Sequence, residues 1–319
     1  MRQFTQCNPV RHPLDEENMV IRTLIVGYGY LGQRVAKLCR DQGDHVFATT
    51  RSTDKFEAIA DAGHIPVKLD WNIASDCRNL PTVDRILIAV SYDRGSNVDR
   101  ETSMVVGLSR LLRYVPATTS LCYISTTGVY HQGGGQWVDE SSPTRPQRDG
   151  GKAHLRAESL LRDRRTRSGK AGRYVILRLS GIYGPGRIPR AADVRAGHPI
   201  ASPSEGYLNL IHVDDAALAV RSGWRYAETC DTGDSKTFVV SDDCPVVRSE
   251  FYEAIAHYYH APPPKFIQPS DDAPVRFRSE SNKRIWNRRM KRDLVSSLTY
   301  PTYREGLIDV LARTVLTGT

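Results

Sequence analysis

The chain has 319 residues, of which 40% are hydrophobic and 25% are charged, and its formal net charge is +8. This composition is ordinary for a globular protein, and no run of about 18 apolar residues is present, so we predict no transmembrane span. Residues 1–18 form a polar leader without the apolar core of a secretory signal. The six cysteines form neither a CxxC pair nor a zinc-binding pattern, so we expect no metal and favour a cytoplasmic protein with free thiols.

The first half of the chain alternates short strand-like runs with helical patterns. Strands are predicted, in chain order, at 20–26, 45–49, 65–69, 85–90, 120–125 and 174–179. Helices are predicted between them from Leu31 to before Gly43, from Phe56 to near Gly63, at 102–115 and at 152–165. The alternation predicts βαβ units, and therefore an α/β fold with a Rossmann-like, doubly wound parallel sheet.

After residue 184 the pattern becomes irregular, with many prolines and glycines and one aromatic-rich helix at 250–260. We expect residues 20–184 to form the main domain and residues 206–240 to return to it. Residues 185–205 and 241–319 would then form a smaller C-terminal α+β lobe that binds substrate.

Two basic clusters, at 162–173 and 283–292, carry much of the positive charge. No sequence motif of a nucleic-acid reader accompanies them, so we do not expect a nucleic-acid partner. The clusters are either solvated helix faces or part of a pocket for an anionic small molecule.

A glycine-rich turn separates the first predicted strand from the first predicted helix, and its residues are Gly27, Tyr28, Gly29, Tyr30, Leu31 and Gly32. In a GxGxxG turn the first glycine permits the tight turn, the second lets a pyrophosphate approach the backbone, and the third lets helix and strand pack closely. The helix N-terminus adds free N–H groups and the positive end of a dipole. Because the strand and the helix are both present, the turn predicts a dinucleotide cofactor, NAD or NADP.

The end of the second strand bears on the choice between these cofactors. An NAD site usually has Asp or Glu there to bind the ribose 2′-hydroxyl, whereas this chain has Thr49, Thr50, Arg51 and Ser52. Arg51 can pair with a 2′-phosphate and Ser52 can donate a hydrogen bond to it. We therefore favour NADP, with NAD as the alternative in which Arg51 is a solvated loop residue that stacks on adenine.

Five segments occur in an order that resembles the extended short-chain dehydrogenase/reductase family of epimerases and dehydratases. They are the glycine turn, Leu69-Asp70, Ser125–Tyr130 (STTGVY), Leu177–Arg187 (LRLSGIYGPGR) and Asn209–Ala217 (NLIHVDDAA). The resemblance implies that Asp70 binds the adenine amino group. It also implies that the cofactor's ribose and nicotinamide are lined by Ala89, Val90, Ser91, Ser125, Ile182 and Tyr183.

The family's chemistry is a hydride transfer in which a tyrosine exchanges a proton and a lysine four residues later lowers its pKa. The resemblance places the Ser/Thr that orients the substrate at Thr126. Counting back from Glu158 places the tyrosine at Gly150 and the lysine at His154, and neither has the required side chain. The chain therefore resembles an atypical branch of the family that lacks the YxxxK dyad. Three residues are candidates to replace the dyad: Tyr130, Lys152 and His154.

Family members also use basic residues of the C-terminal lobe to bind the diphosphate of a nucleotide-linked substrate. In this chain Arg187, Lys283 and Arg284 are candidates for such a site, and ordinary surface charge is the alternative. Asn209 is a further candidate for facing the substrate. The acidic pair Asp214-Asp215 is expected to cap the helix that follows it.

Two hypotheses of function follow. The first is an NAD(P)-dependent oxidoreductase or epimerase/dehydratase-like enzyme. Its substrate would be a small anionic molecule, for example one that is linked to a nucleotide. The second is a catalytically silent NADP(H)-binding sensor or scaffold protein. The helices at 102–115 and 152–165 would pair two subunits in a homodimer, but both are charged, so a monomer stays open.

Overall fold

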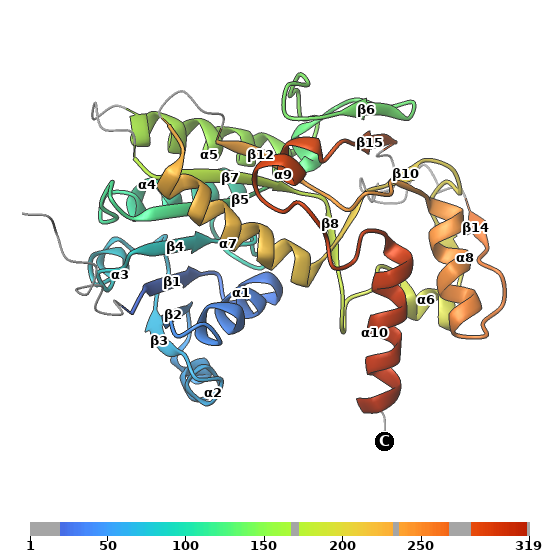
Figure 1. Ribbon diagram of the computed structural model, residues 1–319, viewed down its shortest axis with the longest axis horizontal. Coiled ribbons are helices and arrows are strands. Elements are labelled where there is room, and N and C mark those ends of the chain that lie inside the picture. Colours follow the sequence, from blue (N-terminus) through green and yellow to red (C-terminus); the bar gives the residue numbers. More distant parts are fainter. Residues whose placement is uncertain (1–19, 167–171, 232–235, 268–281, 318–319) are drawn as a thin grey trace, which may run out of the picture.

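The computed structural model describes residues 20–166, 172–231, 236–267 and 282–317, so the leader predicted at 1–18 lies outside the described residues. A seven-stranded sheet forms the centre of the molecule (Figure 1). Its strands are β1 (Arg22–Val26), β2 (His45–Thr50), β3 (Ile65–Lys68), β4 (Arg85–Ile88), β5 (Ser120–Thr126), β7 (Tyr174–Leu179) and β12 (Thr237–Val240).

The strand order is β12-β7-β5-β4-β1-β2-β3, and every neighbouring pair is parallel. The order reverses between β1 and β4. At such a switch point the carboxyl ends of the strands diverge and leave a crevice in which a ligand binds. The Rossmann-like parallel sheet predicted from the sequence is confirmed.

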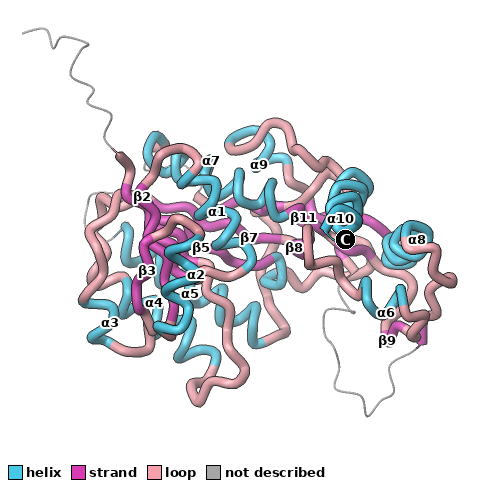
Figure 2. Tube along the Cα trace, turned by 90° about the horizontal axis from the view of Figure 1, so that it is seen from below, coloured by secondary structure: helices cyan, strands magenta, loops and turns pink. Residues whose placement is uncertain are grey.

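The helices of this part are α1 (Tyr30–Arg40), η1 (Thr53–Lys55), α2 (Phe56–Asp61), α3 (Ala74–Arg78), η2 (Thr102–Val106), α4 (Gly107–Leu111), η3 (Thr127–Val129), α5 (Asp149–Thr166), α7 (Val213–Thr229) and α9 (Arg288–Asp293). They lie on both faces of the sheet: α1 and α7 on one side, α3 and α4 on the other (Figure 2).

Alternate residues of the strands point to opposite faces, which gives the sheet two cores. On β1, Ile25 packs with Val35 of α1 and Trp224 of α7, whereas Leu24 packs with Leu108 of α4 and Leu161 of α5. These side chains are almost completely buried. The near-continuous apolar strands are therefore explained by helices on both faces.

A smaller lobe lies beside the carboxyl ends of the strands (Figure 1). Its core contains Tyr183, Phe251 and Tyr303. Its helices are α6 (Ala191–Arg195), α8 (Arg248–Tyr258) and α10 (Tyr303–Thr317). Short paired strands lie outside the main sheet: β6 (Gln136–Val138) with β15 (Lys283–Ile285), β8 (Gly181–Tyr183) with β11 (Leu210–His212), β9 (Ile200–Ala201) with β14 (Phe266–Ile267), and β10 (Tyr207–Leu208) with β13 (Val246–Val247).

The helix predicted at 102–115 is shorter in the structure, where η2 and α4 end at Leu111. The last predicted turn precedes Pro116, and a proline disfavours the helical conformation of the residue before it. The helix predicted at 152–165 is longer, because α5 begins at Asp149. Within the described ranges, no helix has the length and apolarity needed to cross a membrane.

Candidate functional site

The glycine turn between β1 and α1 has the geometry that a dinucleotide needs. Gly27 has φ of 101°, and a Cβ there would lie 2.6 Å from the Ala89 carbonyl oxygen. A Cβ on Gly32 would lie 2.2 Å from the Gly27 carbonyl oxygen, so helix and turn pack without space for a side chain. A Cβ on Gly29 would meet nothing within 4 Å, and Gly29 caps α1 without a side-chain hydrogen bond. The open space and the uncapped N–H groups fit a pyrophosphate.

The two tyrosines of the turn are anchored to different parts of the molecule. The Tyr28 hydroxyl is 2.9 Å from Nδ1 of His64. The Tyr30 hydroxyl donates a hydrogen bond to the carbonyl oxygen of Pro185, and the guanidinium of Arg187 lies 5.2 Å from the Tyr30 ring centre. Tyr30 therefore ties the turn to the segment that leaves β8. Leu31 is buried in the core beneath the turn.

The side chains at the carboxyl end of β2 are polar. Arg51 is exposed and forms an ion pair of 2.8 Å with Asp93, which follows β4. Ser52 accepts a hydrogen bond from the backbone N–H of Asp54 and so caps η1. After β3, Oδ1 of Asp70 accepts two hydrogen bonds from Asn72. The pair of Arg51 and Asp93 therefore lies between the two loops that follow β2 and β4.

The segment after β4 passes directly against the glycine turn. The backbone N–H of Ala89 donates to the carbonyl oxygen of Val26, and the backbone nitrogen of Val90 would lie 3.0 Å from a Cβ on Gly27. Ala89 and Val90 are partly exposed and Ser91 is exposed. This segment therefore forms one wall beside the turn, as the family resemblance implies.

The segment at β8 forms part of the interface with the smaller lobe. Ile182 is partly exposed, whereas the Tyr183 side chain is fully buried and its hydroxyl donates to the carbonyl oxygen of Thr302. Burial raises the pKa of Tyr183 above its ordinary range. The Tyr183 hydroxyl therefore belongs to the core of the smaller lobe.

A buried polar network lies below the carboxyl end of β5. Arg178 donates two hydrogen bonds to the Glu158 carboxylate, at 3.0 and 2.7 Å, and a third to the Tyr130 hydroxyl at 2.8 Å. Ser125 donates a further hydrogen bond of 2.6 Å to Glu158. Burial alone would raise the pKa of Glu158, but the hydrogen bonds and charge of Arg178 hold it below its ordinary value. The network is a paired and fully hydrogen-bonded charge cluster.

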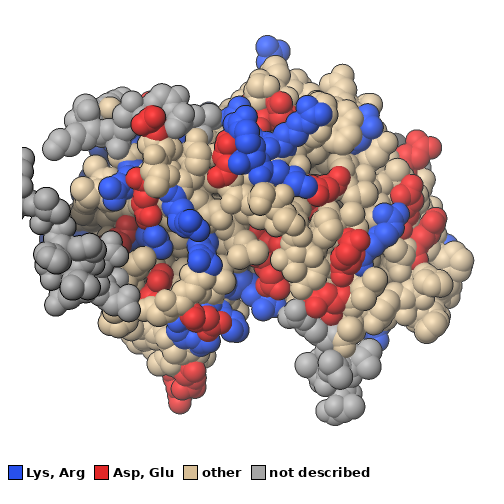
Figure 3. Space-filling model, in the orientation of Figure 1, with Lys and Arg blue, Asp and Glu red and all other residues tan. Residues whose placement is uncertain are grey.

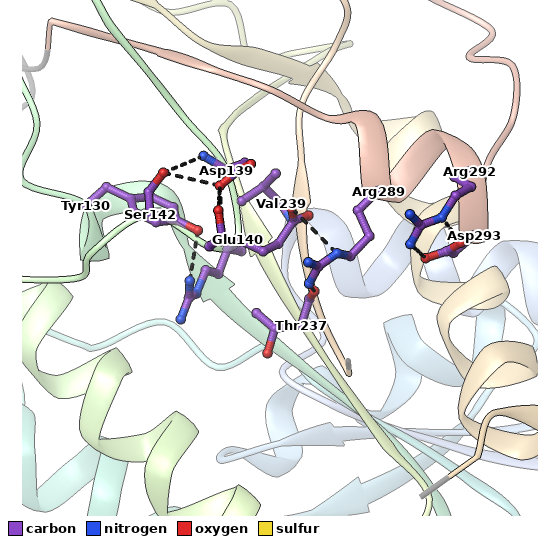
Figure 4. Close-up of polar contacts among 11 residues, drawn as sticks. Tyr130, Asp139, Glu140, Ser142, Thr237, Val239, Arg289, Arg292 and Asp293 are labelled. Atoms are coloured by element: carbon purple, nitrogen blue, oxygen red, sulfur yellow. Dashed lines mark hydrogen bonds and ion pairs between the residues drawn. The ribbon is translucent and has the colours of Figure 1, made fainter. Parts of the chain in front are cut away.

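Tyr130 is therefore committed to Arg178, and burial raises its pKa to about 12. Figure 4 shows it beside the segment that holds Glu140, whose carboxylate accepts the backbone N–H of Val239 on β12. Arg289 of α9 donates to the carbonyl oxygen of Thr237 from the other side (Figure 4). These contacts fix the chain between β6 and α5 against the sheet.

The positions of the missing dyad lie at the start of α5. Nδ1 of His154 is 3.0 Å from the Tyr123 hydroxyl, and burial lowers the pKa of His154 to about 4. Lys152 is exposed and lies 3.8 Å from Asp149, in a shallow depression on the outer face of α5. Thr126 accepts the backbone N–H of Gly128 and so caps η3. Because its pKa is about 4, His154 is uncharged at neutral pH.

Beside Gly150 the structure places Arg100, a residue that the sequence did not indicate. A Cβ built on Gly150 would lie 3.4 Å from Nη1 of Arg100. Arg100 is 50 positions earlier in the chain, in no recognisable motif, so only the folded structure brings the two together.

The candidates for substrate binding are gathered around β15. The Asn209 side chain donates to the carbonyl oxygen of Lys283 and accepts the N–H of Ile285. Lys283 is buried and donates to the carbonyl oxygen of Tyr130, and burial lowers its pKa to about 8. Arg284 donates to the carbonyl oxygen of Gly135.

Arg284 also lies over the rings of Trp137 and Tyr207, at 4.8 and 5.0 Å from their centres. Asn209 and Arg284 therefore hold β15 in place, while Arg187 is exposed. Positively charged side chains gather beside this region, over α9, as Figure 3 shows.

The acidic pair after β11 makes structural contacts, but the prediction that it caps the following helix is wrong, because His212 caps α7. The backbone N–H of Asp214 donates to Nδ1 of His212, and the Asp215 carboxylate accepts the backbone N–H groups of Thr299 and Tyr300. The buried Asp215 thus ties the start of α7 to the segment before α10.

Comparisons with known proteins agree with this geometry. The model of the NAD dependent epimerase/dehydratase family matches residues 23–240. A conserved protein of unknown function from Silicibacter pomeroyi DSS is 27% identical with a TM-score of 0.73, and the alignment covers 92% of this chain and 99% of that one. No curated protein matches the chain by sequence.

Two more distant structures share the fold. UDP-N-acetylglucosamine 4-epimerase from Bacillus cereus is 16% identical, with a TM-score of 0.70 and coverage of 92% and 99%. dTDP-glucose 4,6-dehydratase from Bacillus anthracis, solved in complex with NAD, is 15% identical, with a TM-score of 0.73 and coverage of 93% and 97%.

Proposed function

Because the chain belongs to the NAD-dependent epimerase/dehydratase family, we propose that it is an NADP-dependent oxidoreductase or epimerase-like enzyme with an anionic substrate. The observation that carries this proposal is the glycine turn, where open space at Gly29 meets the uncapped end of α1. Such a site holds a pyrophosphate through backbone N–H groups and the helix dipole. When bound, the nicotinamide supplies the capacity to accept or donate a hydride.

The preference for NADP is supported by the residues after β2. Arg51 and Ser52 replace the carboxylate that binds a ribose 2′-hydroxyl in NAD sites. Arg51 is paired with Asp93 in the structure, and the exposed pair costs little to separate. A 2′-phosphate carries more negative charge than Asp93 and offers more oxygens, so it would draw the guanidinium from this partner.

The substrate side of the proposal rests on residues outside the glycine turn. Thr126 would orient the reacting oxygen, since it ends β5 as the family's Ser/Thr does. Arg187 is exposed beside Tyr30 and offers a guanidinium to an anionic group. Lys283 would contribute positive charge from β15, with Asn209 and Arg284 fixing that strand. The nucleotide sugars named for two similar structures support a nucleotide-linked substrate.

A second function is favoured by one observation, the state of the dyad positions. Gly150 has no side chain, and His154 is neutral and hydrogen-bonded to Tyr123. Tyr130 is bound to Arg178 and is also unsuited to proton transfer at neutral pH. A chain of this kind can bind NADP(H) as a sensor or scaffold without turnover.

Hydride transfer separates the two functions. The purified chain is mixed with NADPH labelled with deuterium at C4 and with two groups of carbonyl compounds, namely 2-oxo acids and 4-keto nucleotide sugars. The enzyme proposal predicts deuterium in a reduced product and loss of nicotinamide absorbance. Binding of NADPH without label transfer to either group would contradict the enzyme proposal and favour the sensor.

A further inference from the structure

The place of the missing tyrosine is occupied by a guanidinium. Nη1 of Arg100 lies 3.4 Å and its Cζ 3.9 Å from the position of a Cβ on Gly150. Arg100 also lies close enough to His154 for its charge to help keep that ring neutral, after the larger effect of burial. One permanent cation from the end of the β4 loop therefore stands where the family has a proton-exchanging tyrosine and its lysine.

Arg100 lacks a counter-ion. Its side chain is half-buried, and no hydrogen bond or ion pair joins that side chain to another residue in the described ranges. The nearby carboxylates have other partners: Asp99 accepts from Thr102, Glu101 pairs with Arg156, and Asp149 faces Lys152. A guanidinium without an anionic partner in the protein is available to pair with a carboxylate of a ligand.

The position of the guanidinium leaves its hydrogen-bonding edge available. Its Cζ lies 4.4 Å from the ring centre of Tyr92, so one face is stacked on an aromatic side chain. Tyr92 directly follows the segment at 89–91 that lines the wall beside the glycine turn. Arg100 therefore lies between the residue that follows this wall and the first turn of α5.

We propose that Arg100, standing beside Gly150, binds a carboxylate of the substrate, so that the substrate of this chain is a carboxylic acid. This inference rests on the proposed function and names its substrate class. A planar carboxylate matches the two parallel N–H donors of a guanidinium, whereas an uncharged sugar hydroxyl does not. Arginine stays protonated in proteins, so Arg100 positions and neutralises the substrate and exchanges no proton with it.

Oxalate, a planar dicarboxylate, is the probe that tests this site, and calorimetry measures its binding with and without NADPH. The wild-type chain is expected to bind oxalate, and Arg100→Gln is expected to weaken binding at least about tenfold, or 1.4 kcal/mol. Arg100→Lys keeps the positive charge but lacks the two parallel N–H donors, and its affinity for oxalate is expected to lie between those of the wild type and Arg100→Gln. The matched control is Arg113→Gln, which removes an exposed arginine after α4 and is expected to bind oxalate as the wild type does.

Circular dichroism checks that each variant is folded, and NADPH affinity is expected to be the same in all of them. Unchanged oxalate binding in Arg100→Gln, tighter binding of inorganic phosphate than of oxalate at this residue, or no oxalate binding by the wild type would overturn the proposal. Failure of NADPH to bind would instead contradict the proposed function, and oxalate binding to the cofactor-free chain would still decide the role of Arg100.

Discussion

His154 illustrates how burial sets the chemistry available at one residue. Its ring lies between Tyr123 and the first turns of α5, where burial lowers its pKa to about 4. A group with this pKa is neither a proton donor near neutrality nor a substitute for the positive charge of lysine. The chain therefore keeps a hydrogen bond at this position in place of the family's cation.

His154→Gln is expected to make stability less dependent on pH. An unfolded histidine takes up a proton near pH 6.5, whereas His154 in the folded chain does so only near pH 4. The wild type should therefore lose stability as pH falls through this window, by about 2 kcal/mol between pH 7.5 and pH 5. Urea unfolding at these two pH values measures the difference, and an equal loss in the variant would show that His154 is not its source.

Asp242 is a buried acid whose carboxylate has too few hydrogen bonds to offset the cost of burying its charge, so its pKa is raised where that of His154 is lowered. It is 1% exposed, Oδ2 has no hydrogen-bond partner among the described residues, and burial raises its pKa well above the ordinary value. Ionisation is thus costly in the folded chain, so stability should fall as pH rises from about 4 through the raised pKa.

Asp242→Asn removes the ionisation while keeping an oxygen for the backbone N–H of Cys244. We expect the variant to be more stable than the wild type at pH 8 by about 1–3 kcal/mol and similar to it at pH 4. Thermal unfolding across this pH range provides the measurement, and a variant that is less stable at pH 8 would refute the account of Asp242.

At the scale of elements, the turn from β1 to α1 contains one glycine that folding requires and another that cofactor binding requires. Gly32 is required by packing, because a Cβ there would lie 2.2 Å from a backbone oxygen, whereas Gly29 adjoins open space and has a φ of −95° that alanine adopts readily. Two alanine variants of the same turn should therefore fail for different reasons.

Gly29→Ala is expected to unfold at nearly the wild-type temperature but to bind NADPH at least about tenfold more weakly, since its methyl group occupies the pyrophosphate space. Gly32→Ala is expected to lower the unfolding temperature. Scanning calorimetry and NADPH fluorescence measure the two properties. Normal NADPH binding by a folded Gly29→Ala would place the pyrophosphate elsewhere.

The elements that could be predicted are those whose signal is local. The glycine turn, the apolar strands and α5 are each defined by residues within one stretch of chain. Arg100 beside Gly150, and Asn209 tied to β15, depend on contacts between distant segments. Their charge and hydrogen-bonding capacity indicated that Arg284 and Asn209 can bind a ligand. Only the fold shows that the side chains of both residues already make hydrogen bonds to other parts of the protein.

At the scale of the whole molecule, the two lobes meet at the glycine turn. Tyr30 begins α1 and donates to Pro185, while Asp215 lies in the first turn of α7 and accepts from the segment before α10. The main sheet and the smaller lobe are thus joined at the ends of two helices that lie on the same face. We expect cofactor binding at the turn to stabilise both lobes together, because the cofactor binds only the folded turn, which each lobe contacts.

The cofactor titration tests the central claim of this account most directly. Nicotinamide fluorescence is followed while NADPH or NADH is added to the wild type, to Arg51→Asp and to the control Arg113→Asp. We predict that NADPH binds the wild type and the control at least about tenfold more tightly than NADH, a difference of about 1.4 kcal/mol, and that Arg51→Asp abolishes the preference. Binding of neither nucleotide by the wild type would contradict the claim that the glycine turn is a cofactor site.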